Sequence, residues 1–385
     1  MNRTKAIGAL LKKERESLNY SLKYVTEKMG FQHHQILSKI EKGTREIKAW
    51  ELVKLVKIYG RKIDFFLSGQ QEVTQTSRVL WREPERTSET IQAERKLLLF
   101  CENYKKLLEL TGENYTKTTF SPMSTVTKEN FKNGKFDFVV ELAERYRNQL
   151  NLGGRPSYSL CSVLEGNLGV LVLYLDLNGG SAASTSGSVC NAILMNSRNA
   201  PWRQNYDLAH ELFHLITWDV FSDEEIYSKP KSGKKNEVEQ WAEAFASALL
   251  LPAEEVRTEF SKRVIDKKIP YISLIEIARE FRISIEALLW RLTNLNLLNR
   301  KNVLKCLTEG NIKDIDKEMR ITDWGEKQYL SERYITLAIK ALHIGKITRA
   351  RFTEYVDIAF SEVPSFLKKY GYSENEDYTI AFSAT

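Results

Sequence analysis

The chain has 385 residues, of which 42% are hydrophobic and 28% charged, with 8 Pro and 19 Gly. This balance is typical of folded domains and excludes extended disorder, collagen-like repeats and a coiled-coil rod. At roughly 150 residues per domain, the length predicts two to three domains. The longest apolar stretch, Gly169 to Leu175, is far shorter than the ~20 residues of a membrane-spanning helix, so we expect no membrane partner.

The first sixteen residues carry Lys and Glu where a signal peptide has its apolar run, so a cytoplasmic location is expected. The cysteines lie far apart and form no Cys-x-x-Cys pair, which predicts reduced structural thiols and no cysteine-rich zinc site. They are Cys101, Cys161, Cys190 and Cys306.

Positive charge is concentrated at one end of the chain. Residues 1–70 hold 15 Lys and Arg against 7 Asp and Glu, whereas the other 315 residues hold 42 against 43. A basic module attached to a neutral body is typical of a nucleic-acid-binding domain, because neutralising phosphates supplies much of the affinity. A solvated basic surface without a ligand would give the same count.

Hydrophobic periodicity predicts five short helices in residues 1–70. Ser21 is the expected N-cap of the second helix, and Gly30 ends it. The third helix, over residues 32–42, places Ile36 and Ile40 on its inner face. Its outer face offers the candidate DNA-contacting residues Gln32, His34, Gln35, Ser38 and Lys39.

The run Ser38-Lys39-Ile40-Glu41-Lys42-Gly43 follows the Ser-x-Ile-Glu-x-Gly pattern after the recognition helix, and about 65 residues resemble the XRE-family helix-turn-helix. The resemblance implies that this helix enters the major groove of DNA. A five-helix interaction domain that no longer binds DNA is the alternative.

The remaining chain is predicted to be α+β and mostly α-helical. We expect a polar connector at 71–87, a long helix at 88–110, a loop at 116–134 and a helix at 136–150. Two strands at 168–177 and 189–196 would flank a flexible connection at 179–187, and the second strand would form a sheet edge that pairs with substrate. The predicted divisions are a helix-turn-helix domain at 1–70, a linker and long helix at 71–130, a central domain at 131–300 and a helical region at 301–385.

The segment that carries chemistry is His210-Glu211-Leu-Phe-His214. A four-residue separation puts both imidazoles on one helical face, where they can bind one Zn²⁺ while Glu211 acts as general base toward water. The metzincin extension needs Gly and His where Thr217 and Val220 stand, so that subclass is excluded.

A catalytic zinc takes three protein ligands, so a third donor is required. Glu239 and Glu243 lie four apart on a strongly helical run, which predicts Glu239 as the ligand and Glu243 as hydrogen-bond acceptor for a ligating His. Glu237 is the weaker ligand candidate because it lies about 200° around the helix. The helix could also be an acidic surface without a metal. Tyr206 is a candidate oxyanion donor or a packing residue.

Two motifs lie within residues 130–300: Leu-Ala-His-Glu-Leu-Phe-His-Leu and Glu-x-x-Ala-Glu-Ala-Phe-Ala-x-x-Leu-Leu-Leu-Pro. Through these motifs, the segment resembles the ImmA/IrrE family of zinc metallopeptidases, which are often fused to XRE modules. That family more often has Asn or Asp where Glu243 stands. The resemblance implies a gluzincin-like site with ligands His210, His214 and Glu239, general base Glu211, and a partner transcriptional repressor as substrate.

Two other functions remain open from the sequence. The chain could be a DNA-binding regulator with a structural or sensory zinc site. It could also be the effector of a toxin-antitoxin or phage-defence pair, with a co-encoded antitoxin as its partner.

Overall fold

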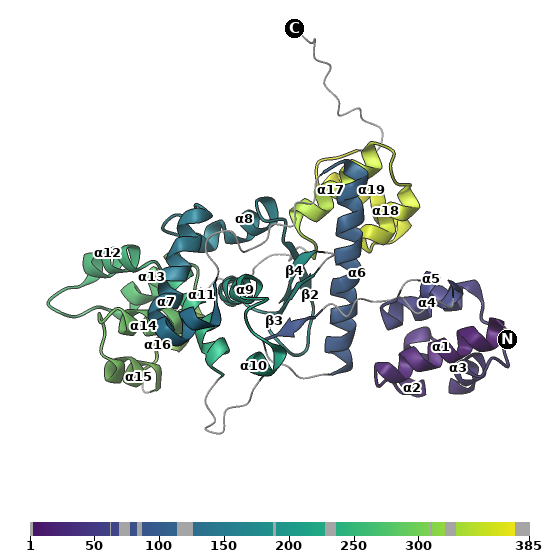
Figure 1. The fold of residues 1–385 in the computed structure, drawn as a ribbon, viewed down its shortest axis with the longest axis horizontal. Helices are drawn as coiled ribbons and strands as arrows, with labels where there is room; N and C mark the ends of the chain where they lie inside the picture. Colours follow the sequence, from purple (N-terminus) through teal and green to yellow (C-terminus); the bar gives the residue numbers. More distant parts are fainter. Residues whose placement is uncertain are drawn as a thin grey trace, which may run out of the picture.

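The computed structural model is mostly helical with one small mixed sheet, which confirms the predicted α+β class (Figure 1). It describes residues 3–61, 63–68, 78–82, 87–113, 126–187, 190–227, 236–308, 310–319 and 329–373.

The first module has the five helices that periodicity predicts. They are α1 (Arg3–Ser17), α2 (Leu22–Met29), α3 (His34–Glu41), α4 (Ala49–Tyr59) and α5 (Ile63–Ser68). The Ser21 hydroxyl accepts the Tyr24 N–H and caps α2, and Gly30 ends that helix at a φ of 74°. The predicted start of the third helix at residue 32 is wrong, because α3 begins at His34 after an extended N-cap at His33.

Helices α1 and α3 pack in direct contact within this module. Gly8 of α1 lies so close that a Cβ there would stand 2.4 Å from the carbonyl oxygen of Ile40. Arg15 of α1 donates to both carboxylate oxygens of Glu41 at 2.7 and 3.0 Å, and both side chains are buried. This charge-assisted pair fixes α3 against α1.

The sheet has the strand order β1-β3-β4-β2, with β2 and β4 parallel and the other pairs antiparallel. Its strands are β1 (Leu80–Trp81), β2 (Leu171–Leu175), β3 (Ala182–Ser186) and β4 (Asn191–Asn196). The expected flexible connection at 179–187 is wrong, since β3 lies within it. The expected connector at 71–87 likewise contains β1.

The strand predicted to be a sheet edge, β4, lies between β3 and β2, so that prediction is wrong. The outer side of β2 is covered as well, because the Tyr174 N–H donates to the carbonyl of Tyr329. The outer side of β3 is paired with β1. Strand order depends on contacts distant in sequence, which periodicity does not report.

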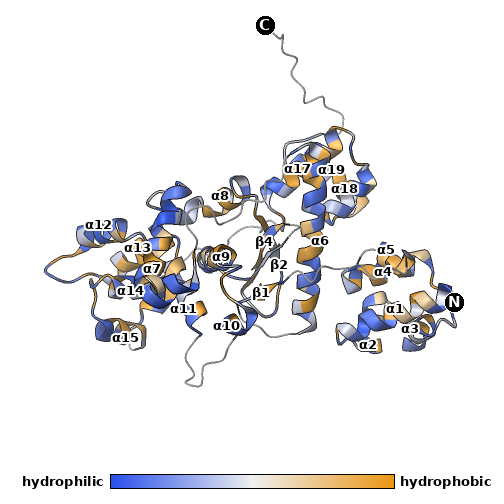
Figure 2. Ribbon diagram, viewed as in Figure 1, coloured by the Kyte–Doolittle hydropathy of each residue, from blue (hydrophilic) through white to orange (hydrophobic). Residues whose placement is uncertain are grey.

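Alternate strand residues face two different hydrophobic cores. Val172 and Ile193 pack with α7 (Lys128–Gln149), α9 (Pro201–Ile216) and α11 (Glu237–Leu250). Leu173 and Leu194 pack on the other face with α6 (Ser88–Thr111) and α17 (Glu332–His343). Figure 2 shows hydrophobic residues concentrated where these elements meet the sheet. The sheet is therefore buried on both faces, which explains its apolar sequence.

Helix α6 confirms the predicted long helix and joins the first module to the sheet (Figure 1). The Gln92 amide donates to the carbonyl of Ile58 at 2.6 Å, and Arg95 donates to that of Tyr59 at 3.0 Å. Helix α7 begins at Lys128, so the loop expected at 116–134 is wrong from that residue on, while 116–125 lies outside the described residues.

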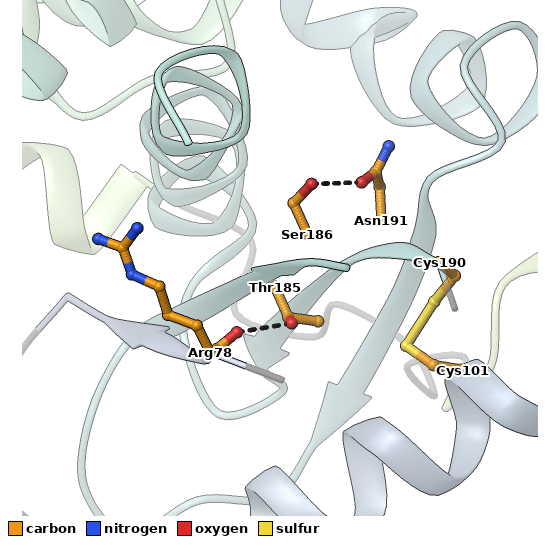
Figure 3. The surroundings of a disulfide bond; sticks show 6 residues. All are labelled: Arg78, Cys101, Thr185, Ser186, Cys190 and Asn191. Atoms are coloured by element: carbon orange, nitrogen blue, oxygen red, sulfur yellow. Dashed lines mark hydrogen bonds between the residues drawn. A yellow bond between two sulfur atoms is a disulfide. The ribbon is translucent and has the colours of Figure 1, made fainter. Parts of the chain in front are cut away.

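Cys101 of α6 and Cys190 before β4 form a disulfide (Figure 3). The prediction of four reduced thiols is therefore wrong for this pair. Packing of α6 across the sheet brings the two Cα atoms within 5.6 Å, although 89 positions separate them in sequence. Cys161 and Cys306 are free.

The other helices complete the two cores. They are the 3-10 turns η1 (Pro156–Tyr158) and η2 (Phe360–Glu362), with α8 (Leu160–Gly166), α10 (Asp223–Tyr227), α12 (Ala253–Arg263), α13 (Tyr271–Glu280), α14 (Ile285–Asn294), α15 (Arg300–Thr308), α16 (Ile312–Met319), α18 (Arg349–Val356) and α19 (Val363–Lys369). Among the described residues, none of the helices is both long and apolar enough to cross a membrane.

Candidate metal centre

Helix α9 positions the His-Glu-x-x-His residues. Pro201 occupies its first turn, where the missing N–H costs nothing. Leu212 and Phe213 are fully buried in the core shared with α7 and α11, so the helix is held on the sheet by its apolar residues. His210 and Glu211 are 0% exposed, and His214 is 3% exposed.

Helix α11 brings the third donor. Its N-cap, Asn236, accepts the Val238 N–H at 2.7 Å, which sets Glu239 in the first turn. Glu239 Oε2 lies 3.2 Å from His210 Nε2, and Glu239 Oε1 lies 3.3 Å from His214 Nε2. The two imidazole Nε2 atoms are 3.2 Å apart. Three donors from two helices therefore converge on one point.

These distances fit a metal ion. Bonds of 2.0–2.1 Å in tetrahedral geometry place neighbouring donors about 3.3 Å apart. Two imidazoles and one carboxylate are also the donor set of a catalytic zinc, which keeps a fourth position for water. His210, His214 and Glu239 are the only group of three or more metal-ligating side chains in the described part of the chain.

Burial and mutual contact set the charge states of the three donors. Burial lowers the pKa of His210 to about 3, so its ring is neutral and able to ligate. Burial also acts to lower the pKa of His214, but the hydrogen bond with Glu239 and the charges of Glu211 and Glu239 together outweigh it, so the pKa is raised. Burial opposes ionisation of Glu239, yet the two imidazoles hold the pKa of this carboxyl well below its usual range.

Glu211 has the properties of a group that can take up and release a proton. Burial raises the pKa of Glu211 to about 7, against the opposing influence of His214. Neither carboxyl oxygen has a hydrogen-bond partner among the described residues. A buried carboxyl that titrates near neutrality is suited to general acid–base chemistry.

Comparison with known families found two matches. Residues 165–293 match the family described as IrrE N-terminal-like domain, a peptidase family, and residues 11–66 match the family described as helix-turn-helix. Both matches lie in one chain, with the helix-turn-helix match upstream of the IrrE N-terminal-like match. No curated protein matches it.

The matched part of the IrrE N-terminal-like domain begins within α8 and ends within α14. It therefore contains β2, β3 and β4 together with the helices that bear His210, Glu211, His214 and Glu239. Strand β1 and helices α6 and α7 lie outside it. Three of the four strands thus belong to the matched domain, and the fourth is supplied from upstream.

Glu243 does not take the position predicted for it. The Nδ1 atoms of His210 and His214 have no hydrogen-bond partner among the described residues, so Glu243 is not their acceptor. Its carboxylate instead lies 3.7 Å from the guanidinium of Arg82. Tyr206 donates to the backbone carbonyl of Glu243 at 2.9 Å, which places it in packing.

Sequence reasoning missed two charged residues behind the centre. Asp207 is fully buried on α9, one turn before Glu211, and forms ion pairs with Arg82 and Arg203. The four-residue spacing from Asp207 to Glu211 could have indicated this residue, because it places both side chains on one helical face. Arg82 carried no such signal, because it is 125 positions from Asp207. Glu237, the weaker ligand candidate, is exposed and outside the donor group.

The candidate DNA-contacting residues lie on or beside α3 of the helix-turn-helix. Gln32, His34, Gln35 and Lys39 are exposed, and Ser38 is half-buried. Gln32 precedes the helix rather than lying in it. The accessible face is thus the one that the sequence predicts.

Proposed function

We propose that this protein is a zinc-dependent endopeptidase that cleaves a partner transcriptional regulator, with DNA association through residues 1–70. The observation that carries the proposal is the convergence of His210, His214 and Glu239 directly beside the buried carboxyl of Glu211. This arrangement has the components of a hydrolytic site.

In this proposal, His210, His214 and Glu239 hold Zn²⁺, which would supply acidification of the attacking water and polarisation of the scissile carbonyl. A carboxylate oxygen of Glu211 accepts the proton of that water and later delivers it to the leaving amine nitrogen. Asp207, held by Arg203 and by the Asn199 amide, fixes the α9 turn that precedes Glu211, so that the Glu211 carboxyl stays oriented.

The proposed substrate is a repressor or antitoxin encoded beside this protein, acting in stress, mobile-element or phage-response control in the cytoplasm. Support comes from the fusion itself, because a helix-turn-helix in the same chain would bring the peptidase to DNA where such a regulator binds. Cleavage would then release the genes that the regulator controls.

The test compares wild type with Glu211→Gln and His214→Ala. Glu211→Gln is expected to retain one zinc per chain and to abolish cleavage of the neighbour-encoded regulator, since it removes only the proton acceptor. His214→Ala should lose both cleavage and zinc, because only two of the three donors remain. Metal content by mass spectrometry and cleavage on gels are the readouts. Undiminished cleavage by Glu211→Gln would refute the catalytic assignment.

One observation favours a second function. His210 and Glu211 are 0% exposed, as in a structural or sensory site of a DNA-binding regulator. That function predicts operator binding that responds to zinc, without proteolysis of any neighbour-encoded protein. Operator binding measured with and without zinc, beside the cleavage assay, separates the two.

A further inference from the structure

A segment from outside the matched domain runs along the strand beside the metal centre. Leu80 and Trp81 pair antiparallel with Ser184 and Ala183 of β3. On one side, the Arg82 backbone N–H donates to the carbonyl of Ala182 at 3.2 Å. On the other side, the Thr185 hydroxyl donates to the carbonyl of Arg78 at 2.7 Å (Figure 3). We call residues 78–82 the strap.

An arginine anchors each end of the strap. The Arg78 guanidinium donates to the carbonyls of Trp218 and Phe221, each at 3.1 Å, and forms an ion pair with Asp223. Arg82 forms its ion pair with the buried Asp207 of α9. The strap is therefore attached to both ends of the region that carries the His-Glu-x-x-His motif.

The strap lies close to the reacting groups. Ser184, which pairs with Leu80, lies in β3, and β3 packs directly against α9, the helix that bears Glu211. The backbone N–H of Trp81 donates to the Tyr227 hydroxyl at 3.0 Å. Burial raises the pKa of Tyr227, and the nearby charge of Glu211 contributes. The outer edge of β3 is thus the sheet edge nearest the proton acceptor.

An open strand edge binds extended peptides through backbone hydrogen bonds. A peptide held along β3 would lie beside Glu211, as the cleavage of a polypeptide requires. In this structure the chain's own strap makes those hydrogen bonds. The strap lies upstream of residue 165, where the match to that domain begins.

We propose that residues 78–82 are an internal competitor for substrate: they occupy the β3 edge on which an extended segment of the protein substrate binds, and cleavage requires their release. This inference rests on the proposed peptidase function. Release leaves Asp207 paired, since Arg203 Nε lies 3.0 Å from one carboxylate oxygen and the Asn199 amide 3.3 Å from the other. The buried charge therefore does not prevent the strap from leaving.

The test measures peptide binding in the zinc-loaded full chain carrying Glu211→Gln, so that bound peptide is not consumed. The probe is a fluorescent, end-capped peptide with the sequence of residues 78–82. We expect it to bind the Arg78→Ala/Arg82→Ala chain at least about tenfold more tightly than the chain with an intact strap, because the competitor is weakened. Arg198→Ala is the matched control, since that arginine pairs with Asp176 on the surface.

Hydrogen exchange shows where the peptide binds. Amides of β3 should exchange faster in the double variant and regain protection when the peptide is added. Equal peptide affinity in both chains, or unchanged exchange in β3, would overturn the proposal. Should the double variant misfold by circular dichroism, Arg78→Ala alone removes the anchor at the opposite end of the strap from Asp207, and the same two outcomes decide.

The binding test does not depend on cleavage. If the peptide binds as expected but no variant cleaves a regulator, the proposed peptidase function is wrong, whereas the proposal that the strap competes with peptide for the β3 edge is supported. If the regulator is cleaved equally by intact and strap-weakened chains, the competition fails and the peptidase function stands.

Discussion

Replacing Gly8 by Ala has two opposing effects on the stability of the first module, one from helix propensity and one from packing. Propensity alone predicts stabilisation by about 1 kcal/mol, because Ala is the better helix former. In this structure, however, a Cβ at position 8 would stand 2.4 Å from the Ile40 carbonyl oxygen and 2.8 Å from that of Glu41. Both contacts are with backbone atoms, so no side chain can turn aside.

The net effect follows from the contact distances. Ordinary contact begins near 3.4 Å, so α1 and α3 must separate by roughly 1 Å, and overpacking of this kind costs about 1–3 kcal/mol. Ile40 cannot simply tilt its carbonyl, because that oxygen accepts the Gly43 N–H at the end of α3. After the gain in propensity is subtracted, we expect Gly8→Ala to lower the stability of this module by up to about 2 kcal/mol.

Hydrogen exchange of α1 and α3 amides is the appropriate assay, since unfolding of a chain with several cores need not be two-state. Gly166→Ala is the control, because a Cβ there meets nothing within 4 Å and should be neutral or stabilising. Operator binding should weaken in Gly8→Ala and stay unchanged in Gly166→Ala. Slower exchange in α1 and α3 of Gly8→Ala would refute the packing argument.

Three further predictions concern the rest of the chain. Phe213→Ala should lower the free energy of unfolding of the central core by about 3–5 kcal/mol in urea, whereas Phe213→Leu should cost much less; equal costs would contradict tight packing. The hydrogen bond from Arg263 lowers the pKa of Glu259 to about 2, so this pair stabilises the fold above about pH 4.5 and the gain is lost as pH falls toward 2. Glu259→Gln should therefore flatten the acid limb of the stability profile by up to about 1 kcal/mol, and an unaltered limb would exclude the pair as its cause. The double variant Cys101→Ser/Cys190→Ser should have a free energy of unfolding lower by about 4 kcal/mol, measured by thermal unfolding. A reductant should destabilise wild type by the same amount and leave the double variant unchanged.

Local spacing predicted the part of the site that one helix contains. His210 and His214 were readable because a separation of four fixes their shared face, and Glu239 was readable because it begins a second strongly helical run. The strand β3 was not, since its sequence of Ala, Ser and Thr lacks the large apolar residues that mark strands. Those small residues are buried all the same, Ala182 in the core that contains α9 and Ala183 in the core that contains α6.

Contacts distant in sequence could not be predicted in this way. Arg82 reaches Asp207 across 125 positions, and Cys101 reaches Cys190 across 89. Both depend on how α6 and its preceding residues pack against the sheet. The role expected for Glu243 failed for the same reason, because the cation that draws its carboxylate comes from the strap.

The link between Cys101 and Cys190 also makes a covalent ring of the chain that lies between them. A single nick anywhere from residue 102 to residue 189 leaves both fragments joined, so they migrate as one band on a denaturing gel until a thiol is added. The strap lies just upstream of the ring. A cut between the helix-turn-helix and residue 78 therefore breaks the covalent link to the DNA-binding module, while the metal centre, its sheet and the strap remain in one covalent piece.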